Sequence, residues 1–256
     1  MDDNTKLSLA LEKSLKDVEK DKIGLLKEHT LHRVLKFYFS IDEEFHEIKI
    51  GRMYADVVLD NHIYEIQTKS FNLMRKKLEF FLKEHDVTIV YPMALNKTIY
   101  LTNDYGELVS CKKSPKHANP LEIFWELYKI KNFLLDNNLH FKILMLDIDE
   151  YRIEKEKTWK SRKGFERENQ VPKKINYIYD INAASDFKDL LLKYNLKEAL
   201  PPGFHLRFHR ILPFLLPHLH GHCPDPLPEK YQLRFFWITR FPIPWLSCLP
   251  DLGMDR

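Results

Sequence analysis

Cysteine is scarce in this chain, and long hydrophobic runs are absent from its sequence. The three cysteines, Cys111, Cys223 and Cys248, form no Cys-x-x-Cys pair, so we expect no disulfide framework and a reducing, cytoplasmic location. No stretch approaches the roughly 20 apolar residues of a membrane-spanning helix, which predicts no membrane contact. The sequence begins Met-Asp-Asp-Asn, which is acidic and polar and unlike a signal peptide.

Strong net charge is also lacking. The net charge of +3 and the pI of about 8.5 give only weak support for an anionic partner. Hydrophobic residues make up 44% of the 256 residues, with 17 phenylalanines and 12 tyrosines, which is enough for a sizeable core. This length fits one large domain or two small ones.

The most informative segment runs from Tyr54 to Lys69 and predicts a β-hairpin. Side chains alternate over residues 53–60 and again over residues 63–69. Between these runs, Asn61-His62 indicates a two-residue turn, because asparagine tolerates a positive φ.

The expected turn pairs Asp56 with Gln67 and makes Glu65 the diagonal neighbour of Asp56, all on one face of the hairpin. Two carboxylates on neighbouring strands can close onto one divalent cation. A solvated polar face is the alternative interpretation. We expect the opposite face, which carries Ala55 and Val57, to be core in either case.

A helix expected over residues 23–38 adds a third carboxylate. Its apolar stripe includes Leu31 and Leu35, and Glu28 extends that stripe toward the sheet. A carboxylate there needs a partner or a metal ion unless it reaches water at the edge of the core. We expect His29 and His32 to be surface or capping residues rather than ligands.

The segments that follow predict an α/β architecture in which helices cover a mixed sheet. A helix with a buried stripe from Phe71 to Leu82 leaves Arg75, Lys76 and Lys77 off the stripe, where they either face solvent or hold phosphates. The further expected elements are strands at Val87–Tyr91, Thr98–Thr102 and Glu107–Ser110, a helix at Leu121–Leu135 and a strand at Phe141–Ile148.

These residues resemble the PD-(D/E)XK nuclease superfamily, whose core is a helix with Glu, a hairpin with Asp and then Glu-x-Lys, a helix and a further strand. Glu28, Asp56 and Glu65 match the three carboxylates. Ala55 replaces the Pro of that motif and Gln67 replaces its Lys. More narrowly, Tyr64-Glu-Ile-Gln-Thr68 resembles uncharacterised bacterial proteins of this fold that end in a winged helix.

The resemblance implies a restriction-endonuclease-like fold and metal-dependent cleavage of DNA. Asp56, Glu65 and the backbone carbonyl of Ile66 would then hold Mg²⁺ or Mn²⁺, and Glu28 would bind a second ion or a metal-bound water. Gln67 supplies no positive charge, so either it or Lys69 would position the attacking water. The alternative is a nuclease fold that has lost catalysis and serves as a DNA-binding or regulatory module.

Two basic segments add to the expectation of a nucleic-acid partner, because lysine and arginine neutralise phosphates. Residues 155–174 hold eight basic and three acidic side chains, and a solvated linker is the alternative interpretation. The candidate contacts are Arg75, Lys76, Lys112, Lys113, Lys116, Lys160, Arg162 and Lys163. DNA or RNA as the substrate, and a homodimer that acts on two strands, are left open.

Composition divides the chain into a charged N-terminal helix (1–22), the nuclease-like core (23–153), a basic connector with a helical segment (154–200) and an atypical tail (201–256). The first 200 residues hold 28 of the 29 lysines and 4 of the 14 prolines. Because the tail reverses that balance, we hypothesise that a frameshift has replaced a winged helix.

Overall fold

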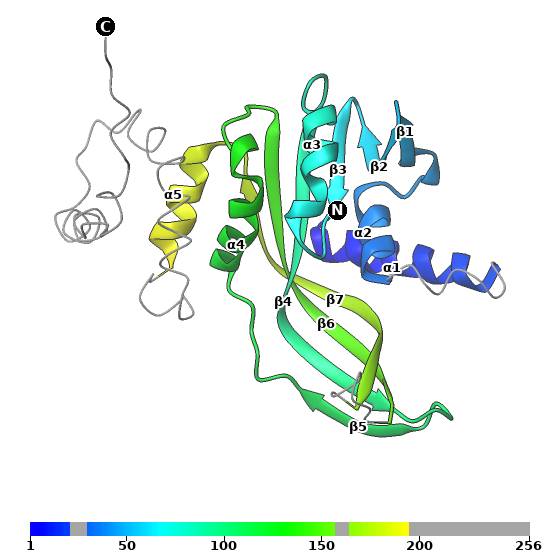
Figure 1. Ribbon diagram of the computed structural model, residues 1–256. Coiled ribbons are helices and arrows are strands. Elements are labelled where there is room, and N and C mark those ends of the chain that lie inside the picture. Colours follow the sequence, from blue (N-terminus) through cyan, green and yellow to red (C-terminus); the bar gives the residue numbers. More distant parts are fainter. Residues whose placement is uncertain (21–29, 157–163, 195–256) are drawn as a thin grey trace, which may run out of the picture. The chain divides into compact units, whose positions relative to one another are not determined.

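The computed structural model describes residues 1–20, 30–156 and 164–194 (Figure 1). These residues form a mixed α/β arrangement built on an open, mostly antiparallel sheet of seven strands in the order β1-β2-β3-β4-β6-β7, with β5 also paired to β4. The strands are β1 (His46–Ile50), β2 (Met53–Leu59), β3 (His62–Ile66), β4 (Asp86–Thr102), β5 (Leu108–Lys113), β6 (Leu139–Glu154) and β7 (Phe165–Ile181). The helices are α1 (Asp3–Lys20), α2 (Thr30–Phe39), α3 (Arg75–Phe81), α4 (Ile123–Leu127) and α5 (Ala184–Lys193), with 3-10 turns η1 (Glu43–Phe45), η2 (Phe71–Met74), η3 (Pro120–Glu122) and η4 (Tyr128–Phe133).

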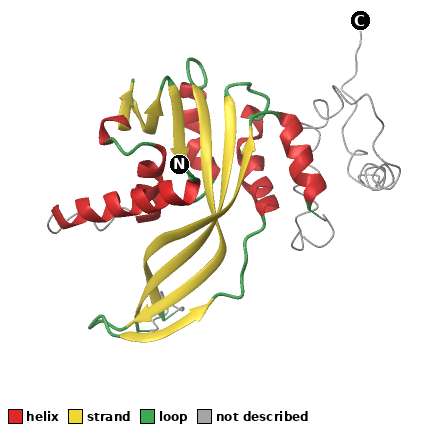
Figure 2. Ribbon diagram, turned by 180° about the vertical axis from the view of Figure 1, so that it is seen from behind, coloured by secondary structure: helices red, strands yellow, loops and turns green. Residues whose placement is uncertain are grey.

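Helices α1 and α2 cover one face of the sheet (Figure 2). Leu7 and Leu35 from these helices share a buried cluster with Ile66, Val90 and Leu144 from the strands. The expected N-terminal helix is present as α1. Most of its side chains are exposed, and Leu7 and Ala10 join the core. The helix expected from residue 23 is described from Thr30 onward, because residues 21–29 lie outside the described part of the chain.

The opposite face is covered by η2, α3, α4 and α5. The ring of Phe71 stacks on Phe141 of β6, and Phe187 of α5 contacts both Phe141 and Phe124 of α4. The buried stripe predicted for residues 71–82 is confirmed. The single helix expected over residues 121–135 is instead three short helical pieces, and Ile130 has a non-helical backbone.

The β2–β3 hairpin forms where the sequence predicts it, with a different register. Asp60 and Asn61 both have positive φ, at 47° and 66°, so they are the two turn residues. Val57 consequently pairs with Tyr64, whereas the expected turn at Asn61-His62 would pair Asp56 with Gln67. The pairing has moved by two residues, and an even shift leaves every side chain on its expected face.

Strand β4 is one continuous strand of 17 residues rather than the two short strands expected. Pro92 lies inside it, where a missing N–H normally excludes proline from a sheet. The Val90 carbonyl accepts a hydrogen bond from the Gln67 N–H, so the backbone of Val90 faces β3. Two residues further, the backbone nitrogen of Pro92 also faces the side of β3. Because β3 ends at Ile66, no partner there needs the absent N–H.

The segment predicted as a basic connector contains a long strand, and helix α5 follows it. Residues 165–181 form β7, which pairs antiparallel with β6 along most of its length. On the other side of β6, β4 pairs with it in parallel, and the short β5 pairs with the later part of β4. Residues 157–163 and the Pro-rich tail, with the proposed winged-helix replacement, lie outside the described residues.

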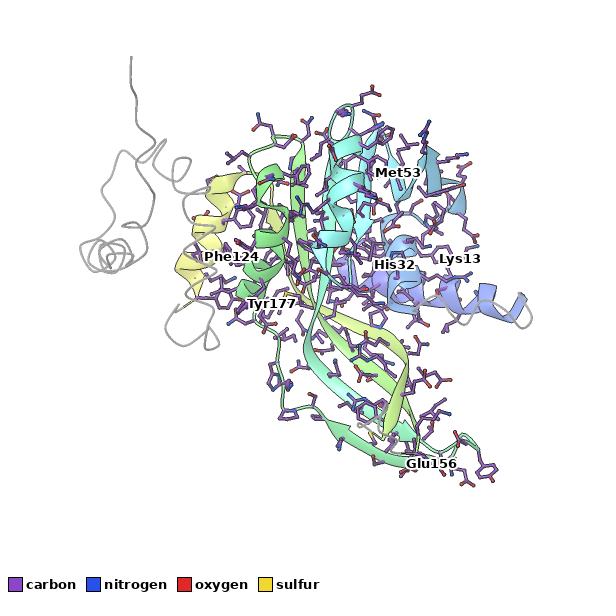
Figure 3. All side chains as sticks on the ribbon, viewed as in Figure 1. Lys13, His32, Met53, Phe124, Glu156 and Tyr177 are labelled. Carbon is purple, nitrogen blue, oxygen red and sulfur yellow. The ribbon has the colours of Figure 1, made fainter. Side chains whose placement is uncertain are left out.

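The later half of β4 from Asn96, β5, β6 from Asp147 and β7 up to Lys174 extend past the helices as a twisted arm (Figure 1). Bulges between Ala94 and Asn96 and between Asp147 and Ile148 mark its start, because a bulge bends a strand and increases its twist. Glu156, which follows β6, lies near the far end of this arm (Figure 3).

A buried ion cluster lies within the arm. The Glu150 side chain is 0% exposed and accepts hydrogen bonds from Lys97 (3.0 Å), Arg152 Nε (2.6 Å) and Gln170 (2.9 Å). Arg167 Nε lies 3.2 Å from the same carboxylate. Burial raises the pKa of Glu150, but the hydrogen bonds and charges of these cations outweigh it and lower the pKa to about 2.

We predict that Glu150→Gln lowers the free energy of unfolding by about 3 kcal/mol at neutral pH, because three basic side chains lose their buried counter-charge. In the wild type this stabilisation is present above the ordinary pKa of 4.5 and is lost as the pH falls toward about 2. Urea unfolding over a pH series measures both effects. Glu154→Gln, on an exposed residue of the same strand, is the control; equal losses in the two variants would contradict the prediction.

Candidate functional site

The β2–β3 ladder ends where the acidic residues begin. Its last pair is Val57 with Tyr64, and that register places Asp56 beside Glu65. The next N–H along β3, that of Ile66, donates to the Asp56 carboxylate (2.8 Å) instead of to the backbone of β2. N–H and C=O of one strand residue point the same way, so the Ile66 carbonyl also faces β2.

Glu65 is a buried carboxylate held by one lysine. Its side chain is 2% exposed, and Lys77 Nζ of α3 donates to both of its oxygens, at 3.0 and 2.8 Å. Burial, and secondly the negative charge of Asp56, raise the pKa of Glu65 to about 8, although Lys77 opposes both. A buried carboxylate pair of this kind favours an added cation.

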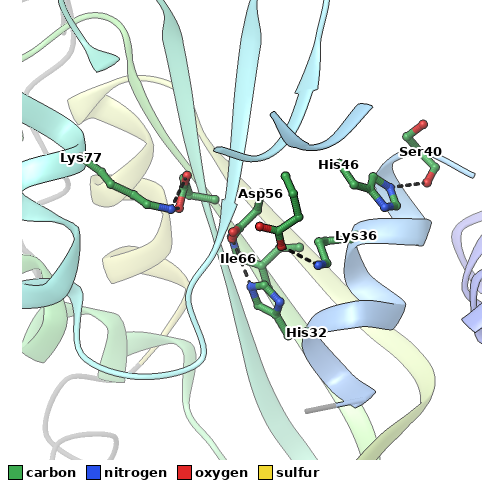
Figure 4. Close-up of polar contacts among 9 residues, drawn as sticks. His32, Lys36, Ser40, His46, Asp56, Ile66 and Lys77 are labelled. Atoms are coloured by element: carbon green, nitrogen blue, oxygen red, sulfur yellow. Dashed lines mark hydrogen bonds and ion pairs between the residues drawn. The ribbon is translucent and has the colours of Figure 1, made fainter. Parts of the chain in front are cut away.

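Asp56 has partners of its own. His32 Nε2 of α2 lies 3.1 Å from its Oδ2 (Figure 4). Burial raises the pKa of Asp56, but the His32 contact, the charge of Lys77 and the Ile66 N–H outweigh it and lower the pKa below the usual value. At neutral pH, Asp56 is therefore the ionised member of the pair, and Glu65 holds its proton more tightly.

A further ion pair involves β1, which pairs with β2 on the side away from β3. The pairing of His46 with Val57 and of Ile48 with Ala55 places Glu47 of β1 opposite Asp56. Glu47 has a positive φ of 52°, which is uncommon for a residue with a side chain. Lys36 Nζ of α2 donates to its carboxylate (2.8 Å), so α2 supplies basic groups to both Asp56 and Glu47.

Not all of the other residues expected to be catalytic lie beside Asp56 and Glu65. Gln67 lies beyond β3 and donates its side-chain amide to the carbonyl of Ser70 (2.8 Å), so it does not lie opposite Asp56. Lys69 is exposed in the loop that follows β3, so the alternation expected through residue 69 ends at Ile66. Glu28 lies outside the described residues.

The expected phosphate contacts fall into two groups. Arg75 and Lys76 are exposed on α3, one turn or less from Lys77. Lys112 and Lys113 are exposed on β5, and Lys116 is exposed in the loop that follows it. The remaining expected contacts, Lys160, Arg162 and Lys163, lie outside the described residues.

Sequence reasoning missed Lys77 and His32 as members of the site. Lys77 follows Met74 by three residues and precedes Phe81 by four, so the helical period places it at the edge of the buried stripe. His32 likewise precedes Leu35 by three residues. Attention to stripe edges rather than to stripe centres would have identified both.

The residues present fit a hard divalent cation in part. Asp56, Glu65 and the Ile66 carbonyl are oxygen donors at one place, and Mg²⁺ is commonly held by one or two carboxylates with water and substrate phosphate. The described residues contain no group of three or more His, Cys, Asp or Glu side chains arranged to hold a metal ion. The described donors alone therefore make a two-carboxylate site.

Residues 29–182 match the family model described as Domain of unknown function (DUF8091). An "Uncharacterized protein" of Treponema pallidum (strain Nichols) is 26% identical over 168 residues, which cover 65% of this chain and 64% of that relative. The match thus spans a little less than two thirds of the relative's length. No solved structure matches the chain, and within the described residues no helix is both long and apolar enough to cross a membrane. Because the family model covers more than half of the sequence, the chain belongs to the family of the Domain of unknown function (DUF8091).

Proposed function

We propose that this chain is a metal-dependent nuclease with a restriction-endonuclease-like core that hydrolyses DNA phosphodiester bonds. The observation that carries the proposal is the meeting of Asp56, buried Glu65 and Lys77 at the open end of the β2–β3 ladder. The pKa values of this buried acidic pair are shifted in opposite directions, a pattern that is typical of binding and catalytic sites.

The order of elements supports the same assignment. Helix α2, the β2–β3 hairpin, helix α3 and strand β4 follow one another as in the core of the PD-(D/E)XK superfamily. The hairpin supplies Asp56 from its first strand and Glu65 from its second. The likeness lies in element order and in the position of these carboxylates, and it supports the fold assignment to that extent.

Asp56, Glu65 and the Ile66 carbonyl would hold the Mg²⁺ or Mn²⁺. When bound, this ion would polarise the scissile phosphate and lower the pKa of a water. Ion binding requires Glu65 to be deprotonated, and Asp56 is the carboxylate already ionised at neutral pH. Glu28 remains the candidate for a second ion or its water.

Lys77 takes the role that the resemblance assigns to the lysine replaced by Gln67. Its ammonium group is already at Glu65, and the side chain is 29% exposed, so it can also meet a phosphate from solvent. It would stabilise the negative charge that develops on the phosphate. His32 positions Asp56 through the 3.1 Å contact, and Arg75 and Lys76 on the exposed part of α3 would bind flanking phosphates.

One observation favours the second candidate, a DNA-binding module without catalysis. Lys77 contacts both oxygens of Glu65, and these hydrogen bonds satisfy the buried side chain without any metal ion. A site built only for an internal ion pair would look the same. Metal titration by calorimetry, with Asp56→Asn as the control, separates the candidates, because the nuclease requires a heat of binding that the variant loses.

We predict that Asp56→Asn and Glu65→Gln reduce Mg²⁺-dependent cleavage of plasmid and linear DNA to background. Lys77→Met should reduce the rate about 100-fold through loss of charge stabilisation, and His32→Ala about 10-fold to 100-fold through loss of positioning. Gel-based rates with Mg²⁺ and with Mn²⁺ measure these changes.

Matched controls use exposed residues on or beside the same helix. Glu79→Gln and Lys83→Met make the same side-chain replacements as Glu65→Gln and Lys77→Met, and should leave the rate within about twofold. Circular dichroism confirms that each variant is folded. A wild type that cuts neither DNA nor RNA with any divalent metal would overturn the enzyme assignment.

The raised pKa of Glu65 predicts a pH dependence without metal. A carboxyl group whose pKa is raised on folding stabilises the protein fully below its ordinary pKa of 4.5, and this contribution is lost as the pH rises through about 8. In EDTA, the wild type should lose stability over this range more steeply than Glu65→Gln. Urea unfolding at a series of pH values tests this, and parallel pH profiles for the two proteins would contradict it.

A further inference from the structure

The arm carries a cluster of basic side chains that a buried carboxylate holds in position. Lys97 of β4, Arg152 of β6 and Arg167 of β7 surround the single carboxylate of Glu150. Three positive charges meet one negative charge, so the cluster has two positive charges in excess. Because Glu150 is fully buried, it holds the three cations in place before any ligand arrives.

Two of these cations are held internally and one faces outward. The Lys97 and Arg152 side chains are 20% and 17% exposed, and the Arg152 guanidinium also lies 4.1 Å from the centre of the Phe165 ring. The Arg167 side chain is 52% exposed and contacts Glu150 through Nε. An arginine bound through Nε still presents its terminal nitrogens, which suit the oxygens of a phosphate.

A short chain of contacts links this cluster to the acidic site. Gln170, which donates to Glu150, follows Asn169, and Asn169 Oδ1 accepts the backbone N–H of Thr30 at the start of α2. Two residues further along α2, His32 contacts Asp56. The first turn of α2 therefore contacts both the arm, through Asn169, and the acidic pair, through Asp56.

The cluster lies on the same face of the sheet as α1 and α2. Along β6, Leu146 and Ile148 belong to the core beneath these helices, and Glu150 and Arg152 continue the same alternation. Lys112 of β5 pairs with Ile99 on the same row as Glu150 and adds a further exposed positive charge. One face of the arm thus continues the face from which α2 contributes His32 to the acidic site.

We propose that the Glu150-centred cluster is a phosphodiester-binding site, through which the arm holds a nucleic-acid strand away from the Asp56–Glu65 centre. Arg167 makes the direct phosphate contact, and Lys97 and Arg152 supply the field that favours an anion there. This inference rests on the proposed function for its ligand class, but it concerns binding rather than cleavage.

The test compares Arg167→Gln with Lys174→Gln in the full chain, by fluorescence anisotropy with a short fluorescein-labelled DNA duplex in EDTA. Both substitutions remove one positive charge from an exposed residue of β7. Lys174 is the matched control, because Ile175 beside it belongs to the core under α1 and α2, so Lys174 points to the opposite face. Lys97 and Arg152 still neutralise Glu150 in the Arg167→Gln variant, so we expect it to fold.

Arg167→Gln should weaken binding several-fold at low salt and make the slope of log affinity against log salt shallower by about 0.9, as expected for one lost phosphate contact. Lys174→Gln should change neither quantity. Equal weakening in both variants, no weakening in either, or no binding of DNA by the wild type would overturn the proposal.

Cleavage by the wild type is measured in parallel with Mg²⁺, so that the two proposals fail separately. Arg167-dependent binding without cleavage supports the arm site and overturns the nuclease assignment. Cleavage with unchanged binding by Arg167→Gln supports the nuclease and overturns the arm site. Inorganic phosphate is added as a competitor to test whether the contact requires a polymer. A strand held at several points is displaced only by high concentrations of phosphate.

Discussion

The early end of the β2–β3 ladder is the constraint on which the candidate site depends. Backbone pairing stops after Val57 and Tyr64, and the Asp56 side chain takes the N–H of Ile66 that the ladder would otherwise use. Because the side chain replaces a backbone acceptor, a carboxylate lies at the sheet next to buried Glu65. Two acidic groups in that position repel each other, so basic residues must approach from the neighbouring helices. Lys77 from α3 and His32 from α2 meet that requirement.

The sequence predicted the carboxylates better than it predicted their surroundings. Alternation along a strand has a period of two, and the turn at Asp60-Asn61 moved the register by two residues, so Asp56 and Glu65 remain neighbours across the hairpin. The partners were harder to identify because tertiary packing decides them. Lys77 resembles any other exposed helical lysine until the position of Glu65 is known, and Gln67 resembles a ligand until its amide is seen at Ser70.

Larger features of the fold were missed for similar reasons. The strand expected to end at Tyr91 continues through Pro92 in β4, since the neighbouring β3 has already stopped. The charges of residues 155–174 indicated a linker, yet many of them belong to β7, a strand whose polar side chains alternate between the two faces of an arm. Charge density alone does not distinguish a solvated linker from a strand with both faces partly exposed. The family match from residue 29 to 182 includes both β4 and β7.

The backbone irregularities of the outer strands affect whether copies of this chain can pair edge to edge. At one end of the main strand order, β1 carries Glu47 in a left-handed conformation, and at the other end β7 carries Pro172 between bulges. A left-handed residue and a proline both interrupt the regular row of unpaired N–H and C=O groups that an incoming strand needs. The outer edges of β1 and β7 therefore resist pairing with an incoming strand, and self-association that extends the sheet through either of them is disfavoured.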